Sequence, residues 1–355
     1  MVFGSAFRAS TVGLDIGSSA VKAVALRHGR SGWSLVAAGE AATPDGSLEG
    51  GVAAQPVAIS DAVRSVMDSL RLHRAQVATA LSGHSVVVKR LLLPAMTQPE
   101  LEEAIPWEAE QYIPFEMSDV QLDYQVVNGA DDATRTSLDV LLVAAKRDRI
   151  DDRAAVIAHA GRNPVVIDIE AFALANAYEM NYPERSDPLA ALVHVGRSTT
   201  IVCLLEKGQP VFTRDIAIGG HIHFEALKRE FESSGLEDLA LLRLLHGQIP
   251  SDINRDQVSN VLREATEQIV VEIRKTIDFY RATAPVERLS RIVLSGGAWQ
   301  AVGLVDLLGS EFGAPVDIFD PFRRVARPSR AIGADATGPG YAVAVGLALR
   351  AEGDR

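Results

Sequence analysis

The chain has 355 residues, of which 47% are hydrophobic and 23% are charged, and its formal net charge is −11. This length predicts two domains, or two lobes around a cleft, and the composition is typical of a soluble globular enzyme or ATPase rather than of a disordered chain. The acidic balance argues against a general nucleic-acid binder, because affinity for phosphate backbones rests on clustered Lys and Arg, and it favours a surface for protein partners.

The first half of the chain predicts alternating strands and helices. Glycines and polar residues divide the first forty residues into a three-stranded meander, and apolar residues at near-helical spacing follow it. The predicted elements are strands 11–16, 20–26 and 33–40, helix 56–72, strands 77–82 and 85–93, helix 97–112, strand 139–145, helix 149–160, strand 164–169 and helix 171–178.

The helix predicted at 97–112 begins with a capping signature and contains an internal proline. Thr97 is the expected N-cap, with Pro99 in the first turn and Glu100 three residues after the cap. Pro106 removes a backbone donor and clashes with the preceding turn, so we expect a kink or two short helices there. A strongly negative patch is also predicted, because residues 97–119 contain no Lys or Arg and seven acidic residues, namely Glu100, Glu102, Glu103, Glu108, Glu110, Glu116 and Asp119.

The second half opens with the same kind of meander and then becomes helical. The predicted elements are strands within 189–205 and at 211–218, helices over 223–282, a strand at 291–294 that leads into "SGGA" (295–298), a following helix, and an apolar helix at 341–349. The single cysteine, Cys203, excludes an internal disulfide framework or cysteine metal site and fits the cytoplasm. Residues 1–10 lack the apolar core of a signal peptide and no run approaches the ~20 apolar residues of a spanning helix, so we expect any membrane association to be indirect.

Two glycine loops repeat at an offset of 179 positions. The segments "GLDIGSSAVKAV" (13–24) and "LVHVGRSTTIVC" (192–203) both consist of a strand, a glycine turn and a strand, and Gly17 coincides with Gly196. Backbone N–H groups in such a turn wrap a phosphate, and Asp15, just before the first turn, is placed to hold a hydrated magnesium ion. Either loop alone also fits a plain β-hairpin, but two facing loops predict a clamp for a phosphate chain.

The order of the remaining motifs indicates a family. The first loop, "DIEAFALANAY" (168–178), the second loop and "LSGGA" (294–298) resemble, in that order, the phosphate, connecting and adenosine motifs of the actin-like ATPase superfamily. Within it, "GLDIGSSAVKAV", "LSGHSVVVKRLLLPAMTQPELEEAIPWEAEQYIPFE" (81–116) and "TRDIAIGG" (213–220) resemble the PilM family, the cytoplasmic actin-like components of type IV pilus assembly and relatives of the division protein FtsA.

This resemblance implies an α/β actin-like ATPase fold with two lobes around a nucleotide cleft. Lobe I would comprise residues 1–187 and 338–355, with an inserted FtsA-like subdomain 1C at about 83–162. Lobe II would comprise residues 188–337, with a core subdomain 2A and a helical subdomain 2B at about 223–290. The cofactors it implies are ATP or ADP and Mg²⁺.

The resemblance also assigns roles to individual residues. Asp15 would hold the metal, and Glu170 would take the place of the connecting-helix acid that positions metal-bound water. Glu272 and Lys275, one turn apart on a helix, would reach the adenosine, or else form an ordinary solvated salt bridge. The full cofactor-binding set is Asp15, Gly17, Ser18, Ser19, Lys22, Gly196, Arg197, Ser198, Glu272, Lys275, Gly296 and Gly297.

His194 departs from the superfamily pattern, which has an aspartate in the second phosphate motif. Histidine prefers softer metals than magnesium and is mostly neutral at pH 7, whereas the loop's backbone groups are unchanged. Loss of a catalytic acid–base group costs roughly 10²-fold to 10⁴-fold in rate, so we hypothesise that ATP binds with magnesium and turns over slowly or not at all. The alternative is that His194 is a strand residue satisfied by a neighbour, with no role in the cleft.

The resemblance implies that subdomain 1C, with the neighbouring first lobe, receives the N-terminal cytoplasmic peptide of the inner-membrane protein PilN. An aromatic residue off the helix's apolar face and an apolar tip suit such docking, and the expected contacts are Trp107, Ile113, Pro114 and Phe115. The same aromatic residues also fit the subdomain's own core.

The expected function is therefore an ATP-binding scaffold on the cytoplasmic face of the inner membrane. It would link PilN and the platform proteins to the pilus motor ATPase, possess weak or no ATPase activity, and have the capacity to form a homo-oligomer or ring. The alternatives are an active or filament-forming ATPase of the FtsA type and, less well supported because "VHVGRS" has no catalytic Asp, a sugar kinase.

Overall fold

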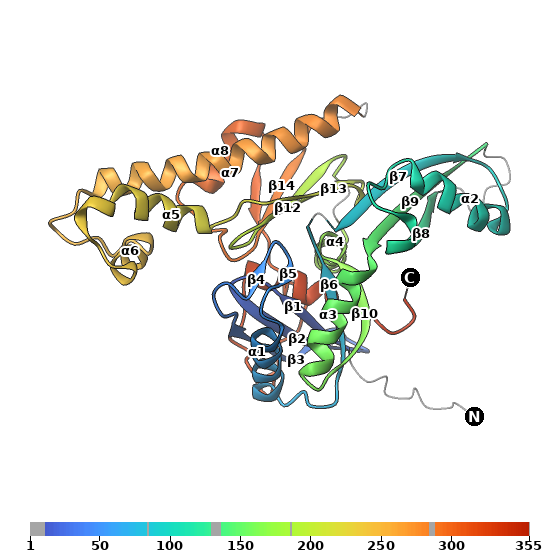
Figure 1. The fold of residues 1–355 in the computed structure, drawn as a ribbon, viewed down its shortest axis with the longest axis horizontal. Coiled ribbons are helices and arrows are strands. Elements are labelled where there is room, and N and C mark those ends of the chain that lie inside the picture. The colour runs from blue at the N-terminus through green and yellow to red at the C-terminus, as the bar shows by residue number, and fades with distance from the viewer. Residues whose placement is uncertain (1–10, 84, 129–135, 185–186, 284–287, 355) are drawn as a thin grey trace.

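The computed structural model describes residues 11–83, 85–128, 136–184, 187–283 and 288–354. Figure 1 shows two sheets stacked as an upper and a lower body, a small sheet projecting to one side and a helical arm projecting to the other. The sequence accounts for this plan through two similar halves, each of which builds one of the stacked sheets.

The first sheet has five strands in the order β10-β6-β1-β2-β3. A hairpin forms its centre, with Asp15 opposite Lys22 across antiparallel β1 and β2, and β6 and β10 extend it in parallel. Helices α1 and α3 cover one face and share an apolar core with it. The bounds are β1 Val12–Ile16, β2 Ala20–Gly29, β3 Gly32–Ala42, β6 Gln76–Leu81, β10 Asn163–Ile169, α1 Pro56–Ser69 and α3 Arg147–His159, and a small hairpin pairs β4 Leu48–Glu49 with β5 Val52–Ala53.

The second sheet repeats this topology in the order β13-β12-β11-β14-β15. Its central hairpin places His194 opposite Ile201, and β14 and β15 extend it in parallel just as β6 and β10 extend the first sheet. The repeat predicted from two loops is thus a repeat of whole sheets. The bounds are β11 Ala190–Val195, β12 Thr200–Glu206, β13 Gln209–Ile216, β14 Arg291–Ser295, β15 Val316–Ile318 and, on its outer face, α8 Leu304–Phe312.

Helices α4 (Glu170–Asn181) and α9 (Ala342–Leu347) lie between the two sheets and join them into one core. Helix α9 packs closely against backbone on two sides. A Cβ on its Gly346 would lie 1.8 Å from the Ala173 carbonyl oxygen of α4, and a Cβ on Gly13 of β1 would lie 2.0 Å from the Ala344 carbonyl oxygen of α9. The cluster between the sheets includes Leu26 of the first sheet and Leu192 of the second. The short 3₁₀ turn η3 (Pro339–Tyr341) leads into α9.

The projecting small sheet has the order β7-β9-β8 and its own core against α2. As predicted, Glu100 caps the start of α2, where its carboxylate accepts the Thr97 backbone N–H at 2.7 Å. Of the two alternatives expected at Pro106, a kink or two short helices, the second is wrong, because α2 continues through Pro106. The bounds are β7 Val86–Pro94, α2 Gln98–Glu110, η1 Met117–Asp119, β8 Val120–Asn128 and β9 Ser137–Lys146.

The helical arm consists of α5, α6 and α7, which enclose a small apolar cluster that includes Leu227, Leu241 and Leu262. The longest helix, α7, also lies across the second sheet, because Ile269, Ile273 and Ile277 recur at helical spacing on its buried face. The bounds are α5 His221–Glu230, η2 Glu232–Ser234, α6 Asp238–Leu245 and α7 Arg255–Thr283.

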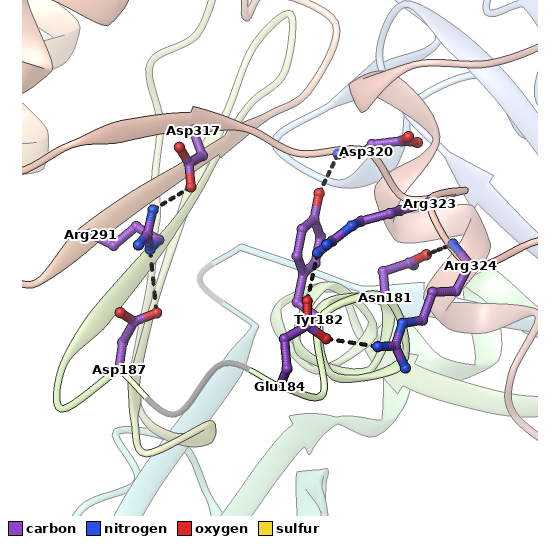
Figure 2. Close-up of polar contacts among 9 residues, drawn as sticks. All are labelled: Asn181, Tyr182, Glu184, Asp187, Arg291, Asp317, Asp320, Arg323 and Arg324. Atoms are coloured by element: carbon purple, nitrogen blue, oxygen red, sulfur yellow. Dashed lines mark hydrogen bonds and ion pairs between the residues drawn. The ribbon is translucent and has the colours of Figure 1, made fainter.

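A polar cluster holds the chain where it crosses between the lobes (Figure 2). Asn181, at the end of α4, donates to the Pro321 carbonyl at 2.7 Å and accepts from the Arg324 backbone N–H at 2.9 Å. The Tyr182 hydroxyl accepts from the Asp320 N–H at 3.2 Å, and Arg323 lies over the Tyr182 ring. Because 181–184 leads into the second sheet and 319–324 returns from it, both crossings are fixed to each other.

Gly346→Ala will destabilise the protein by about 3 kcal/mol, since the new methyl group meets a backbone carbonyl that cannot move aside without shifting α4. Equilibrium denaturation measures this loss. Gly309→Ala is the matched control: its Cβ would lie 3.8 Å from its nearest neighbour, and alanine favours the helix. Equal stability of the Gly346 variant and the native protein would contradict close α4–α9 packing.

Candidate functional site

The two glycine loops face each other across the space between the sheets. The first turn is closed by the Gly17 N–H to Ala20 carbonyl bond at 3.2 Å, and the second by the Gly196 N–H to Thr199 carbonyl bond at 2.8 Å. The loops touch directly through the Ser198 hydroxyl, which donates to the Ser18 hydroxyl at 2.8 Å. The predicted pairing of the two loops is therefore present in the structure.

Backbone donors of both loops are left for a ligand. Among the described residues, the N–H groups of Ser18, Ser19, Arg197 and Ser198 donate to no protein acceptor. Such consecutive donors form a concavity that suits phosphate oxygens. These four N–H groups are therefore available to the oxygens of a phosphate.

Glycines on neighbouring segments brace the second loop. The Gly220 N–H donates to the Gly196 carbonyl at 2.8 Å, and the His221 N–H donates to the Arg197 carbonyl at 2.7 Å. A Cβ on Gly219 would lie 2.6 Å from the Gly196 oxygen, so only glycine allows this approach. The "IGG" of 218–220 thus serves the loop rather than a separate site.

Buried charges lie beside the first loop. Asp15 is 7% exposed, and burial raises the pKa of its carboxyl, while Lys22 and Arg153 oppose the rise. Burial, with the nearby charges of Asp15 and Asp215, raises the pKa of Glu170 to about 8. Glu170 therefore holds a proton at neutral pH in the absence of a ligand, and a bound cation between these carboxyls would release it.

Asp215 of β13 reaches across to the first lobe. Its carboxylate accepts the backbone N–H of Gly83, while the neighbouring Ser82 hydroxyl donates to Glu170 at 2.9 Å. Sequence reasoning missed Asp215 and Arg153. The signals were present: Asp215 is a charge inside a strand, and Arg153 lies one helical turn from the buried Val156 and Ile157.

His194 lies at the end of β11, and its Nδ1 is 3.0 Å from the Ser295 hydroxyl. Burial, together with the charge of Lys22, lowers the pKa of its imidazole to about 3. The ring is therefore neutral at physiological pH, as both sequence interpretations allow, and the Ser295 hydroxyl is its hydrogen-bond partner. It still lies near Lys22 of the first loop's hairpin.

The "LSGGA" turn (294–298), the expected adenosine motif, leaves open space around Gly297. Gly296 has φ +98°, and a Cβ there would lie 2.2 Å from the Val195 oxygen, so this turn requires glycine. A Cβ on Gly297 would meet nothing within 4 Å, and the Cβ of Gly340 would lie 3.7 Å from Lys22. On α7, Lys275 Nζ pairs with Glu272 at 2.6 Å, which is the salt bridge that the sequence allowed.

A separate groove of about 800 Å³ lies between the small sheet and the first lobe. Leu81 and Ile169, the last residues of β6 and β10, line it, and Phe172 and Ala175 of α4 add apolar surface. Charged side chains also line it: Asp123, Asp168, Glu179, Arg350 and Asp354. Arg350 and Asp168 pair at 3.2 Å, with the carboxylate almost fully buried.

The predicted partner residues lie outside the lining of this groove. Trp107 is 75% exposed on α2, as its position off the apolar face predicted, and Pro114 is exposed. Ile113 is only 7% exposed and Phe115 packs against the same core, with Lys146 over its ring. Ile113 is therefore a core residue, and the expected exposed tip does not include it, because the turn after α2 folds back onto the small sheet.

A family model described as "Type IV pilus assembly protein PilM" matches residues 13–352. The chain belongs to the PilM family. A solved "PilM-PilN type IV pilus biogenesis complex" is similar to this PilM family member over 97% of its length and 98% of that chain, with 28% identity and a TM-score of 0.83.

More distant structures show the fold alone. The ethanolamine utilization protein EutJ from Carboxydothermus hydrogenoformans matches with 17% identity and a TM-score of 0.55, over 96% of this chain and 89% of that one. MreB 5 of Spiroplasma citri, bound to AMPPNP, matches with 14% identity and a TM-score of 0.53, over 96% and 95%. The predicted actin-like ATPase fold is confirmed. Within the described part of this PilM family member, no helix combines the length and apolar character needed to cross a bilayer.

Glu170→Gln will change how stability depends on pH. The folded-state pKa of Glu170 is raised to about 8 from 4.5, so its stabilising contribution is complete below pH 4.5 and is lost as the pH rises through 8. We expect the native protein to lose roughly 3 kcal/mol more than the Glu170→Gln variant between pH 5 and pH 9, in denaturation without nucleotide. Glu179→Gln is the control, because the Glu179 side chain is exposed on the same helix. Identical dependence of stability on pH in all three proteins would contradict a raised pKa of Glu170.

Proposed function

We propose that this protein is a nucleotide-binding scaffold of the inner-membrane platform that assembles type IV pili. It binds ATP or ADP with Mg²⁺ in the cleft and the N-terminal cytoplasmic peptide of a PilN protein in the groove, and it links that peptide to the pilus motor ATPase. The observation that carries the proposal is the likeness to a PilM–PilN complex over 97% of the chain at a TM-score of 0.83.

The donor set of the cleft fits a magnesium nucleotide. The unpaired N–H groups at 18–19 and 197–198 suit the phosphates, and the space beside Gly297 suits the base and ribose, with Glu272 and Lys275 as further contacts. Among the described residues, no group of three His, Cys, Asp or Glu side chains is placed to hold a metal alone. Magnesium needs no such cage, because it is held by one or two carboxylates, here Asp15, together with waters and nucleotide phosphates.

The chain's own residues favour binding over turnover. Glu170 is the acid available to position water, but the second loop offers a neutral imidazole where a carboxylate would orient the metal. The backbone cradle does not depend on either side chain. A scaffold that keeps its nucleotide follows from these groups better than a motor does.

The groove suits a short peptide. Its apolar lining from Leu81, Ile169 and Phe172 can take apolar side chains, and its charged residues are mainly acidic, which suits basic or amide-bearing neighbours. The groove, rather than the exposed Trp107, is therefore the surface that we propose for the PilN peptide. Trp107 stays available on α2 for another contact of the assembly.

The purified protein will bind Mg-ATP but release phosphate roughly 10²-fold to 10⁴-fold more slowly than a working ATPase, because the second loop lacks its acid. Isothermal titration measures binding, and a coupled phosphate assay measures turnover. Asp15→Asn will weaken Mg-ATP binding without abolishing it, since the backbone donors are intact. An ordinary ATPase rate that His194→Ala abolishes would overturn the scaffold interpretation.

A synthetic PilN N-terminal peptide will bind to the protein in isothermal titration. Asn176→Arg will lower the affinity for this peptide at least tenfold, equal to about 1.4 kcal/mol, because it places a long cationic side chain in the groove. Leu92→Arg is the control, since it adds the same side chain at a 75% exposed site of the small sheet outside the groove lining. We expect Trp107→Ala to bind normally.

Titrations with and without Mg-ATP then separate two roles for the nucleotide. Equal affinity in both conditions makes it a structural cofactor, and different affinities make it a regulator. Absence of peptide binding in both conditions, or loss of binding in Trp107→Ala alone, would contradict the groove assignment.

A further inference from the structure

One surface of this acidic protein is strongly basic. The segment "LRHGRSGWS" (26–34) forms the tip of the β2–β3 hairpin, and "PFRRVARPSR" (321–330) follows β15, and neither contains an acidic residue. Their basic side chains are all exposed. We call them the arginine surface: Arg27, His28, Arg30, Arg323, Arg324, Arg327 and Arg330.

The backbone places the two segments side by side. The Ala326 N–H donates to the Trp33 carbonyl at 2.9 Å, and the Leu35 N–H donates to the Ala326 carbonyl at 2.8 Å. The chain at Ala326 therefore forms a parallel bridge with β3 beside the hairpin tip. The His28 ring meets the Trp33 ring edge-on at 4.8 Å, and Trp33 packs against the core cluster that includes Phe322 and Val325. The arginines therefore project from a rigid base.

Few carboxylates neutralise this surface. Glu184 accepts from both Arg323 and Arg324 at 2.8 Å (Figure 2), and Asp320 lies 3.9 Å from Arg327. In the part of the chain that the structure describes, Arg27, Arg30 and Arg330 pair with no carboxylate. Arg323 and Arg324 remain 45% and 50% exposed despite their partner.

Arginine is the side chain best suited to phosphate groups. Its planar guanidinium presents paired donors to phosphate oxygens and stays charged at all physiological pH values. Here the guanidinium groups are spread over a hairpin tip and an adjacent extended segment. A layer of phosphate headgroups meets such a spread of charge at many points at once.

We propose that the arginine surface binds the anionic phospholipid headgroups of the membrane in which the peptide-bearing partner is anchored. This rests on the proposed function, because a membrane-anchored peptide in the groove holds the protein close enough for weak headgroup contacts to add to its affinity. The net charge of −11 opposes a general attraction of the whole protein to an anionic membrane, so attachment through the arginine surface gives the protein a preferred orientation. The contact is peripheral and needs no inserted helix.

Flotation of the full chain with vesicles tests this without any peptide. We expect binding at low salt to vesicles of phosphatidylcholine with phosphatidylglycerol, little binding to phosphatidylcholine alone, and release by salt. Arg27→Glu with Arg30→Glu should lower the partition at least tenfold, since each arginine near such a surface contributes roughly a fivefold factor. Arg27 and Arg30 have no carboxylate partner among the described residues and do not belong to the polar cluster of Figure 2. The double variant therefore leaves the lobe crossing intact.

Two controls separate charge from position and shape. Arg255→Glu with Arg263→Glu makes the same charge change on the distant helix α7 and should bind as the native protein does. Arg27→Lys with Arg30→Lys should keep most of the binding, and millimolar inorganic phosphate should not release the protein, which distinguishes a lipid surface from a free-phosphate site.

Vesicle binding that is absent at low salt, or equal in the hairpin and α7 variants, overturns the proposal. Binding of the arginine surface to an acidic polypeptide but not to vesicles would overturn it too and assign the surface to a protein partner. Peptide titration with the hairpin variant in solution should be normal, so failure of the groove and failure of the arginine surface are distinguishable.

Discussion

The packing of helix α4 on helix α9 is the contact on which the rest of the architecture depends. Each helix lies between two sheets, and the approach is so close that a glycine must stand opposite the Ala173 carbonyl. The two lobes therefore share one apolar core rather than meeting across a wet interface. With both sheets fixed to the same helix pair, their central hairpins point their glycine loops at each other, which is the arrangement that a phosphate clamp requires.

The same framework places the cleft and the groove back to back. Strands β6 and β10 pair in parallel with Leu81 opposite Ile169, and both of these residues line the groove. The next residues along the chain, Ser82 and Glu170, bond to each other on the cleft side. The ends of these two strands thus line the groove, and the residues that follow them form a hydrogen-bonded pair in the cleft. One residue after Ser82, the Gly83 N–H donates to Asp215 of the second lobe.

Much of the fold and part of the site could be predicted from the sequence. The paired loops around Gly17 and Gly196 were identifiable because a glycine turn between two apolar strands is a local pattern. Asp215 and Arg153 were not, because their importance comes from tertiary neighbours that no local pattern encodes. Ile113 was misjudged for a related reason: an apolar residue in an acidic stretch looks exposed until the small sheet supplies the partners that bury it.

The contact between Gly13 and Ala344 joins residues separated by 331 positions. The first strand therefore acquires its covering helix only after almost all of the described chain has been made. Synthesis by the ribosome cannot complete the first lobe before the second, although domains usually fold in order as they emerge. Until then, the apolar face of β1 that α9 covers stays open to water, and a truncation before α9 leaves the cluster shared by both lobes without one of its two helices.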